Sequence, residues 1–150
     1  ERSRRGDGRL WRDLCHMSRP TADELGRVER VLELIGIADR GDTPVSALGL
    51  GSCRLVELAR ALVGDPVLLL ADEPSSGLDV QETQELAGVL RSLQKEQGMA
   101  VLLVEHDLAM VGAVVDRTIV MDLGCLVAEG TFAEVMSDPR VRDAYLGTSA

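Results

Sequence analysis

Two adjacent carboxylates follow an apolar run in the stretch PVLLLADEPSSGLD, residues 66–79. The run at 67–71 suits a strand buried on both faces, and Asp72 and Glu73 stand at its carboxyl end. Open α/β sheets bind their ligands at that end of the strands. Neighbouring carboxylates repel each other, and a divalent cation with a phosphate ligand would offset the repulsion. For these two residues alone, a strand followed by a solvated acidic turn is the alternative.

A second apolar run, residues 100–104, also ends in polar residues, Glu105-His106-Asp107. A lone histidine after a strand is most often a hydrogen-bonded surface residue, so its type alone assigns no role. The position of His106 at a second strand end makes it a functional candidate. His16 has no such context and keeps the plain interpretation.

Helix and strand signals alternate along the chain around these groups. A capping-box pattern from Thr21 to Glu24 opens a helical apolar stripe that ends at Gly36. A loop rich in Gly, Pro and Ser follows at 41–51. Further helices are expected at 52–63, 80–97 and 108–114, after Gly130 and at Pro139, and strands at 67–71, 100–104, 117–121 and 125–129. The alternation predicts an α/β fold with a mostly parallel sheet.

Composition limits the class of protein. The chain of 150 residues is long enough for one domain with a real core, and one Trp, one Tyr and one Phe leave that core aliphatic. No apolar run approaches the ~18 residues that a membrane span needs. The three cysteines are odd in number and widely spaced, which fits neither a disulfide framework nor a zinc site.

The net charge of −9 is unevenly distributed. Residues 1–20 carry a net +3, and we expect them to form a basic, poorly ordered lead-in. The rest of the chain carries a net −12, which argues against broad nucleic-acid binding. The first residue is Glu1 rather than Met, which suggests a fragment.

Three motifs together resemble the second half of an ATP-binding-cassette nucleotide-binding domain. LGLGSCRLVELARAL (48–62) resembles the signature loop and its helix, VLLLADEPSSGLD (67–79) the Walker B strand and D-loop, and VLLVEHD (101–107) the switch-histidine strand. The resemblance covers residues 22–147. The tail at 130–147 resembles the subfamily that energises branched-chain amino-acid uptake in bacteria.

The resemblance implies a fold and a division of the chain. The fold is α/β, the carboxyl-terminal part of a P-loop NTPase (RecA-like) parallel-sheet core with part of the helical signature subdomain. After the lead-in, residues 21–63 would form the helical subdomain with the signature loop. Residues 64–129 would form the α/β core, and residues 130–150 the carboxyl-terminal helices.

Family roles transfer to the matching positions, with ATP and Mg²⁺ as cofactors. Asp72 would hold Mg²⁺, through water, and Glu73 would orient or deprotonate the attacking water. His106 would reach the γ-phosphate and stabilise charge in the transition state. Ser76 and Asp79 match the D-loop that contacts the opposite subunit.

The signature segment would present backbone N–H groups and a helix N-terminus to the phosphate of the other subunit. It comprises Leu48, Gly49, Leu50, Gly51 and Ser52. The family pattern Leu-Ser-x-Gly-Gln is altered here, because Gly49 replaces the Ser and Ser52 the Gln. One hydrogen bond to a charged partner is worth about 1.5–3 kcal/mol, so the missing hydroxyl could weaken ATP-driven closure by about tenfold or more.

The resemblance also implies partners and a place in the cell. It implies a second nucleotide-binding domain paired head-to-tail, membrane permease subunits, a solute-binding protein acting indirectly, and no nucleic acid. The chain would be cytoplasmic and peripheral on the cytoplasmic face of the cell membrane. A truncated, non-catalytic module that pairs with a complete cassette is the alternative function. Cassettes of DNA repair or translation are disfavoured by the compact spacing and the acidic body.

One family motif is absent from the sequence. No G-x-x-x-x-G-K-[ST] occurs, and the only lysine, Lys95, falls in an expected helix. We therefore expect no ATP hydrolysis by this chain alone, although the intact domain would be an ATPase. Strands of the same sheet would also be missing, which would expose apolar strand edges. The isolated chain is therefore expected to be marginally stable or oligomeric.

Overall fold

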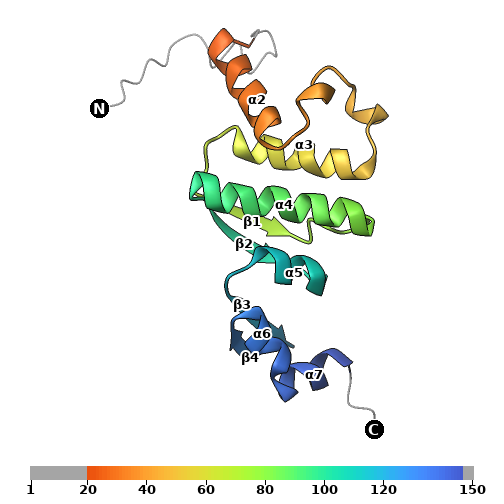
Figure 1. The fold of residues 1–150 in the computed structure, drawn as a ribbon, viewed down its shortest axis with the longest axis vertical. Coiled ribbons are helices and arrows are strands. Elements are labelled where there is room, and N and C mark those ends of the chain that lie inside the picture. The colour runs from red at the N-terminus through yellow and green to blue at the C-terminus, as the bar shows by residue number, and fades with distance from the viewer. Residues whose placement is uncertain (1–19, 147–150) are drawn as a thin grey trace, which may run out of the picture.

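The computed structural model describes residues 20–146 and the side chains of residues 20–144. The basic lead-in, apart from Pro20, lies outside the described residues, as do Cys15 and His16. Helices and strands follow one another along the long axis of the molecule (Figure 1). The elements are α2 (Ala22–Leu34), η1 (Ala38–Arg40), η2 (Val45–Ala47), α3 (Leu50–Leu62), β1 (Leu68–Asp72), α4 (Val80–Gln97), β2 (Ala100–Val104), α5 (Leu108–Val114), β3 (Thr118–Asp122), β4 (Cys125–Gly130), α6 (Phe132–Ser137) and α7 (Pro139–Leu146).

The two helices expected before the first strand are present. The capping box at the start of α2 is confirmed, because the Thr21 hydroxyl accepts from the amide of Glu24 and the Glu24 carboxylate accepts from the amide of Thr21. Helix α3 begins two residues earlier than predicted, at Leu50. Gly49 is its N-cap, with an extended backbone and a carbonyl that accepts from the amide of Cys53 at 3.0 Å.

Strands β1 and β2 form a parallel pair, as the α/β pattern predicts, with Asp72 opposite Val104 at their carboxyl ends. Helix α4 connects them and covers one face of the pair (Figure 1). The prediction that β1 is buried on both faces is wrong. Leu69 is 7% exposed and its neighbour Leu70 is 68% exposed. Within residues 20–146 the sheet that contains β1 has only two strands, and Leu68, Leu70 and Leu102 of these strands are exposed.

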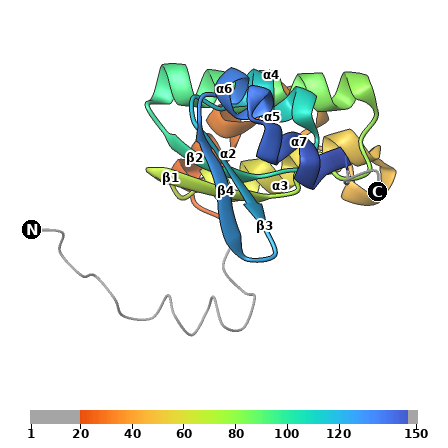
Figure 2. The same ribbon diagram turned by 90° about the horizontal axis from the view of Figure 1, so that it is seen from below.

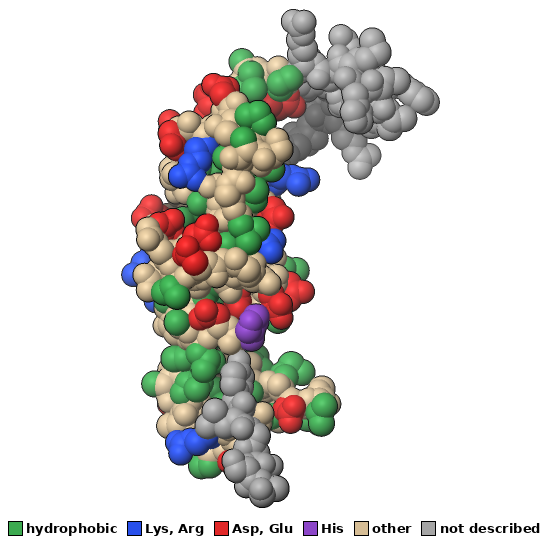
Figure 3. Space-filling view, turned by 90° about the vertical axis from the view of Figure 1, so that its right-hand side faces the viewer, with side chains coloured by type: hydrophobic (Ala, Val, Ile, Leu, Met, Phe, Trp, Pro, Cys, Tyr) green, Lys and Arg blue, Asp and Glu red, His purple; other side chains and the backbone are tan. Residues whose placement is uncertain are grey.

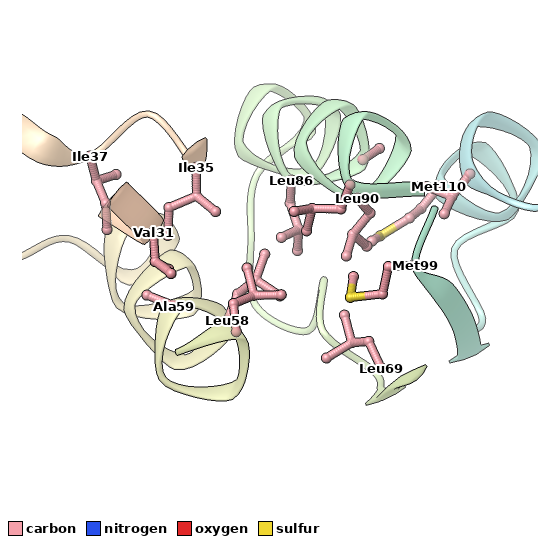
Figure 4. Close-up of a cluster of buried hydrophobic side chains, with 14 residues drawn as sticks. Val31, Ile35, Ile37, Leu58, Ala59, Leu69, Leu86, Leu90, Met99 and Met110 are labelled. Atoms are coloured by element: carbon pink, nitrogen blue, oxygen red, sulfur yellow. The ribbon is translucent and has the colours of Figure 1, made fainter. Parts of the chain in front are cut away.

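The main core lies between α2, α3, α4, α5 and the two parallel strands (Figure 4). It is aliphatic, as the composition requires, and Leu90, Leu93, Met110 and Val114 are its most deeply buried members. Each helix contributes apolar residues three or four positions apart, which places them on one face. No helix of the described residues is both long and apolar enough to span a membrane.

Strands β3 and β4, drawn in blue in Figure 2, form an antiparallel hairpin, and in the described residues they pair with each other and not with β1 or β2. The turn at Leu123-Gly124 uses two residues with positive φ, a geometry that closes tight hairpins. The hairpin shares a small second core with α6 and α7, built on Ala128, Val135 and Val141. The mostly parallel sheet of the sequence prediction is therefore limited to β1 and β2.

Candidate functional site

The carboxyl end of β1 turns sharply at Glu73. Its φ is +43°, in the left-handed region, which costs a non-glycine residue about 1 kcal/mol or more. The Glu73 amide still donates to the carbonyl of Val104 at 2.8 Å, so pairing with β2 continues one residue past Asp72. The side chains of Asp72 and Glu73 both remain exposed at this edge.

The structure brings His106 next to Glu73. His106 Nδ1 lies 3.7 Å from Glu73 Oε1 and 3.9 Å from Glu105 Oε2. The imidazole is 68% exposed, and in Figure 3 the histidine, drawn in purple, lies on the surface among acidic side chains. Two residues from adjacent strand ends, one carboxylate and one imidazole, therefore face the same region of solvent.

Glu105 is a site residue to which the sequence assigned no role. Its side chain is fully buried and accepts from the amides of Ser75 at 2.8 Å, His106 at 3.1 Å and Asp107 at 3.3 Å. Burial alone raises the pKa of Glu105, but hydrogen bonds from the Ser75 hydroxyl and from these amides outweigh it and hold the pKa below its usual range. Glu105 thereby fixes the turn after β1 relative to the turn after β2.

The signature segment, residues 48–52, forms the start of α3. Leu48 is half-buried, Gly49 and Leu50 are exposed, and Gly51 is half-buried. The Ser52 side chain is buried, and the guanidinium of Arg40 donates to its hydroxyl oxygen. The hydroxyl oxygen of Ser52 is thus already hydrogen-bonded to a side chain of the same chain.

The D-loop, residues 76–79, lies against the start of α3. Arg54 Nη2 of that helix donates to the carbonyl of Ser76 at 3.3 Å. A Cβ at Gly77 would meet Leu50 Cδ2 at 3.0 Å, and Gly77 has a φ of +81°, so the position suits only glycine. The structure therefore brings the two predicted nucleotide-facing segments into contact with each other.

Asp79 ends the D-loop and is the N-cap of α4. Its carboxylate accepts from the Glu82 amide at 2.8 Å, and the Glu82 carboxylate accepts from the Asp79 amide at 3.1 Å. This reciprocal pair is a capping box with Asp at the N-cap. The spacing of Asp79 and Glu82 in the sequence is the signal that could have identified it.

The residues at the end of β1 fit a magnesium nucleotide better than a metal held by protein alone. In the described part of the chain no group of three or more His, Cys, Asp and Glu side chains could hold a metal ion. Mg²⁺ in nucleotide sites takes one or two carboxylates and completes its shell with water and phosphate oxygens. The exposed carboxylate of Asp72 suits that donor set.

Two family models match parts of the chain. The ABC transporter family matches residues 7–76, and the family described as branched-chain amino acid ATP-binding cassette transporter matches residues 125–150. The branched-chain amino acid transport ATP-binding protein LivG of Salmonella typhimurium is 36% identical, over 86% of this chain and 51% of LivG. The methionine import ATP-binding protein MetN of Streptococcus mutans is 35% identical, over 85% of this chain and 36% of MetN. The chain spans about half the length of LivG and less of MetN.

Solved structures show the same fold. The ADP conformation of MJ1267, an ATP-binding cassette of an ABC transporter, matches with a TM-score of 0.79 and 28% identity, over 95% of this chain and 58% of MJ1267. CbiO1 of Clostridium perfringens, part of the ABC transporter complex cbiONQ, matches with a TM-score of 0.74 and 31% identity, over 91% of this chain and 55% of CbiO1. The chain therefore has the fold of an ABC transporter ATP-binding cassette, and its sequence is similar to such cassettes over about half of their length.

Proposed function

We propose that the chain acts as part of the ATP-hydrolysing subunit of an ABC transporter. The observation that carries the proposal is the 3.7 Å approach of Glu73 Oε1 and His106 Nδ1 at the adjacent ends of two parallel strands. Ligands of open α/β sheets bind at this edge. A carboxylate and an imidazole together supply an acceptor for a proton of water and a donor toward a phosphate oxygen.

Each residue of the site has a separate task in this proposal. Glu73 orients the attacking water and accepts its proton, and its carboxylate is exposed directly after the last residue of β1. His106 donates to the phosphate whose charge increases in the transition state. Glu105 holds the backbone of both turns and so fixes the distance between the two groups.

Asp72 would hold Mg²⁺ through water, and Mg²⁺ bound to ATP neutralises charge on the phosphates. Because the sequence contains no P-loop, that motif would have to come from another polypeptide segment. The exposed start of α3 would meet the nucleotide of a second cassette in a head-to-tail pair. Ser76 and Asp79 of the D-loop would contact that second cassette.

The proposed cargo is an amino acid, and a branched-chain amino acid in particular. The match of residues 125–150 to the branched-chain family and the 36% identity to LivG support this class, and the similar identity to MetN keeps methionine as the second candidate. Permease subunits would carry the cargo across the membrane, with a solute-binding protein acting on them. The chain would lie in the cytoplasm against the membrane.

Complementation tests the proposal. The chain is co-produced with the P-loop-containing half of the Salmonella typhimurium LivG cassette, and ATP turnover of the purified mixture is measured with Mg²⁺. We expect turnover that neither half shows alone and that Glu73→Gln abolishes. Equal turnover with Glu73→Gln would contradict the role of Glu73. Turnover by the chain alone would contradict the need for an external P-loop.

A non-catalytic pairing module is the second candidate function. It is favoured by the exposure of Gly49 and Leu50 at the start of α3 in a sequence that contains no P-loop. Such a module would bind a complete cassette and inhibit or bias its turnover. Titration of the chain into the complete LivG cassette separates the two candidates, because a module changes the activity of LivG without needing its own Glu73. The Glu73→Gln variant would then act like the unmodified chain.

A further inference from the structure

Glu82 binds two backbone segments with one carboxylate. Its Oε2 accepts from the amide of Asp79 at 3.1 Å, and its Oε1 accepts from the amide of Gly51 at 3.2 Å. The first contact completes the capping box of α4, and the second reaches the first turn of α3. A carboxylate at a helix N-terminus is also favoured by the helix dipole.

The close approach requires glycine at position 51. A Cβ there would lie 2.6 Å from Glu82 Oε1 and 2.9 Å from Glu82 Cδ, distances that real Cβ atoms do not show. Gly51 is helical, so its backbone conformation does not itself require glycine. Contact with Glu82 therefore supplies a reason for glycine at this position that does not involve a nucleotide.

Two further contacts join the same two segments. Leu50 lies against Gly77, and Arg54 donates to the carbonyl of Ser76. The Glu82 contact differs from these because its two acceptor oxygens act on backbone amides of both segments. A shift of either backbone by about 1 Å would lengthen one of the two hydrogen bonds beyond the normal range.

We propose that Glu82 is a positioning residue that makes the D-loop and the signature segment move as one unit. The inference rests on the proposed function, in which both segments meet a second cassette. When Glu82 holds them together, a cassette that engages the D-loop also finds the signature segment in place. We call this pair of hydrogen bonds from Glu82 the clamp. Without it, only a fraction of the molecules would hold the D-loop and the signature segment in the binding arrangement at the same time. The apparent affinity for nucleotide would then be the intrinsic affinity multiplied by that fraction.

Glu82→Gln separates the clamp from the helix cap. Glutamine has one acceptor oxygen, and Gln at this position still completes a capping box, so the Asp79 contact should persist while the Gly51 contact is lost. Amide hydrogen exchange of the full 150-residue chain is followed by NMR. A hydrogen bond to a carboxylate is worth about 1.5–3 kcal/mol, so we expect exchange at Gly51 to accelerate by about tenfold or more. Exchange at Asp79 should change much less.

Glu134→Gln is the matched control, because Glu134 occupies the same place in the capping box of α6 and accepts from Thr131. It should leave the Gly51 amide unchanged. A merely structural role of Glu82 would accelerate the Gly51 and Asp79 amides together and lower the melting temperature. That result, or exchange at Gly51 that matches the unmodified chain, would overturn the proposal.

The complementation assay supplies the functional readout. With Glu82→Gln we expect KM for ATP to rise by about fivefold to tenfold, because fewer molecules are competent to bind, while kcat changes by less than about twofold. An unchanged KM would contradict the clamp. If the unmodified mixture shows no turnover at all, the proposed function fails, and hydrogen exchange alone decides on the clamp.

Discussion

Glu73 and Glu105 are carboxylates at the ends of neighbouring strands, and the fold treats them in opposite ways. Glu105 is fully buried, accepts from three amides and has a lowered pKa. Glu73 is 56% exposed, lies on a strained turn, and faces His106 across 3.7 Å. The carboxylate of Glu105 is occupied by hydrogen bonds within the protein, whereas the carboxylate of Glu73 remains accessible to a ligand.

The difference in burial separates a structural role for Glu105 from a catalytic role for Glu73. A buried carboxylate with all its donors in place holds the local backbone in one arrangement, but it cannot exchange protons readily with substrate. An exposed carboxylate can react, yet it adds little to the free energy of unfolding. Substitutions at Glu105 should therefore change stability, whereas substitutions at Glu73 should change turnover.

The largest effect is expected for Glu73→Gln. In the complementation assay it should lower kcat by at least about 100-fold, since general-base catalysis contributes about 10²–10⁴. The free energy of unfolding should change by less than about 0.5 kcal/mol, because the side chain is exposed. Glu85→Gln, an exposed position on α4, is the control and should retain full turnover. A lower free energy of unfolding in Glu73→Gln would contradict the claim that Glu73, unlike Glu105, contributes little to stability.

Glu105→Ala should show the opposite pattern. The amides of Ser75, His106 and Asp107 would lose their acceptor, and we expect the free energy of unfolding to fall by about 3 kcal/mol. Urea unfolding of the chain measures this. Glu105→Gln retains an acceptor oxygen and should cost less. A loss below about 1 kcal/mol in the alanine variant would show that Glu105 does not hold the two turns.

Gly51→Ala should destabilise the chain by up to about 1 kcal/mol, because the added methyl displaces the flexible end of the Glu82 side chain and breaks its hydrogen bond with the amide of residue 51. The same substitution should cost at least about 0.5 kcal/mol less in a Glu82→Ala background, where the overlap is absent. Thermal or urea unfolding of the four variants of this cycle checks the coupling. Equal costs in both backgrounds would mean that the two residues do not interact.

The lowered pKa of Glu105 predicts a pH dependence of stability. The stabilisation is fully present above the ordinary carboxyl pKa of 4.5 and is lost as pH falls through the folded-state value, because folding then requires loss of a bound proton. The slope cannot exceed about 1.4 kcal/mol per pH unit for one group. Urea unfolding at pH 7 and at several values below 4.5 should show the stability gap between the chain and Glu105→Gln closing with acid. A gap that is constant with pH would contradict the assigned pKa direction.

The smallest effect on stability is expected on the outer face of β1. Leu70 is 68% exposed, so Leu70→Lys should change the free energy of unfolding by less than about 0.5 kcal/mol. It should also reduce self-association, measured by sedimentation, because an exposed apolar strand face favours association between copies. Leu69→Lys, one residue away and 7% exposed, is the control and should prevent folding. Equal self-association of Leu70→Lys and the unmodified chain would show that this face is not where copies meet.

Local signals in the sequence were sufficient for most elements. The capping box at Thr21, the apolar runs and Pro139 placed helices and strands close to where they occur, because these signals act over a few residues. Strand burial was predicted wrongly. Burial depends on which layers cover a strand, and the run at 67–71 does not encode whether a second layer is present.

The sequence by itself determined the chemistry available to this protein: the carboxylates after one strand, the histidine after the next, the glycine-containing signature segment and the absence of a P-loop. Only the tertiary structure decided which of these groups meet. Glu73 faces His106, Glu105 is buried beneath them, and Glu82 reaches Gly51. The physical reason is that such contacts join residues about 30 positions apart, and their geometry follows from strand pairing and helix packing rather than from local preference.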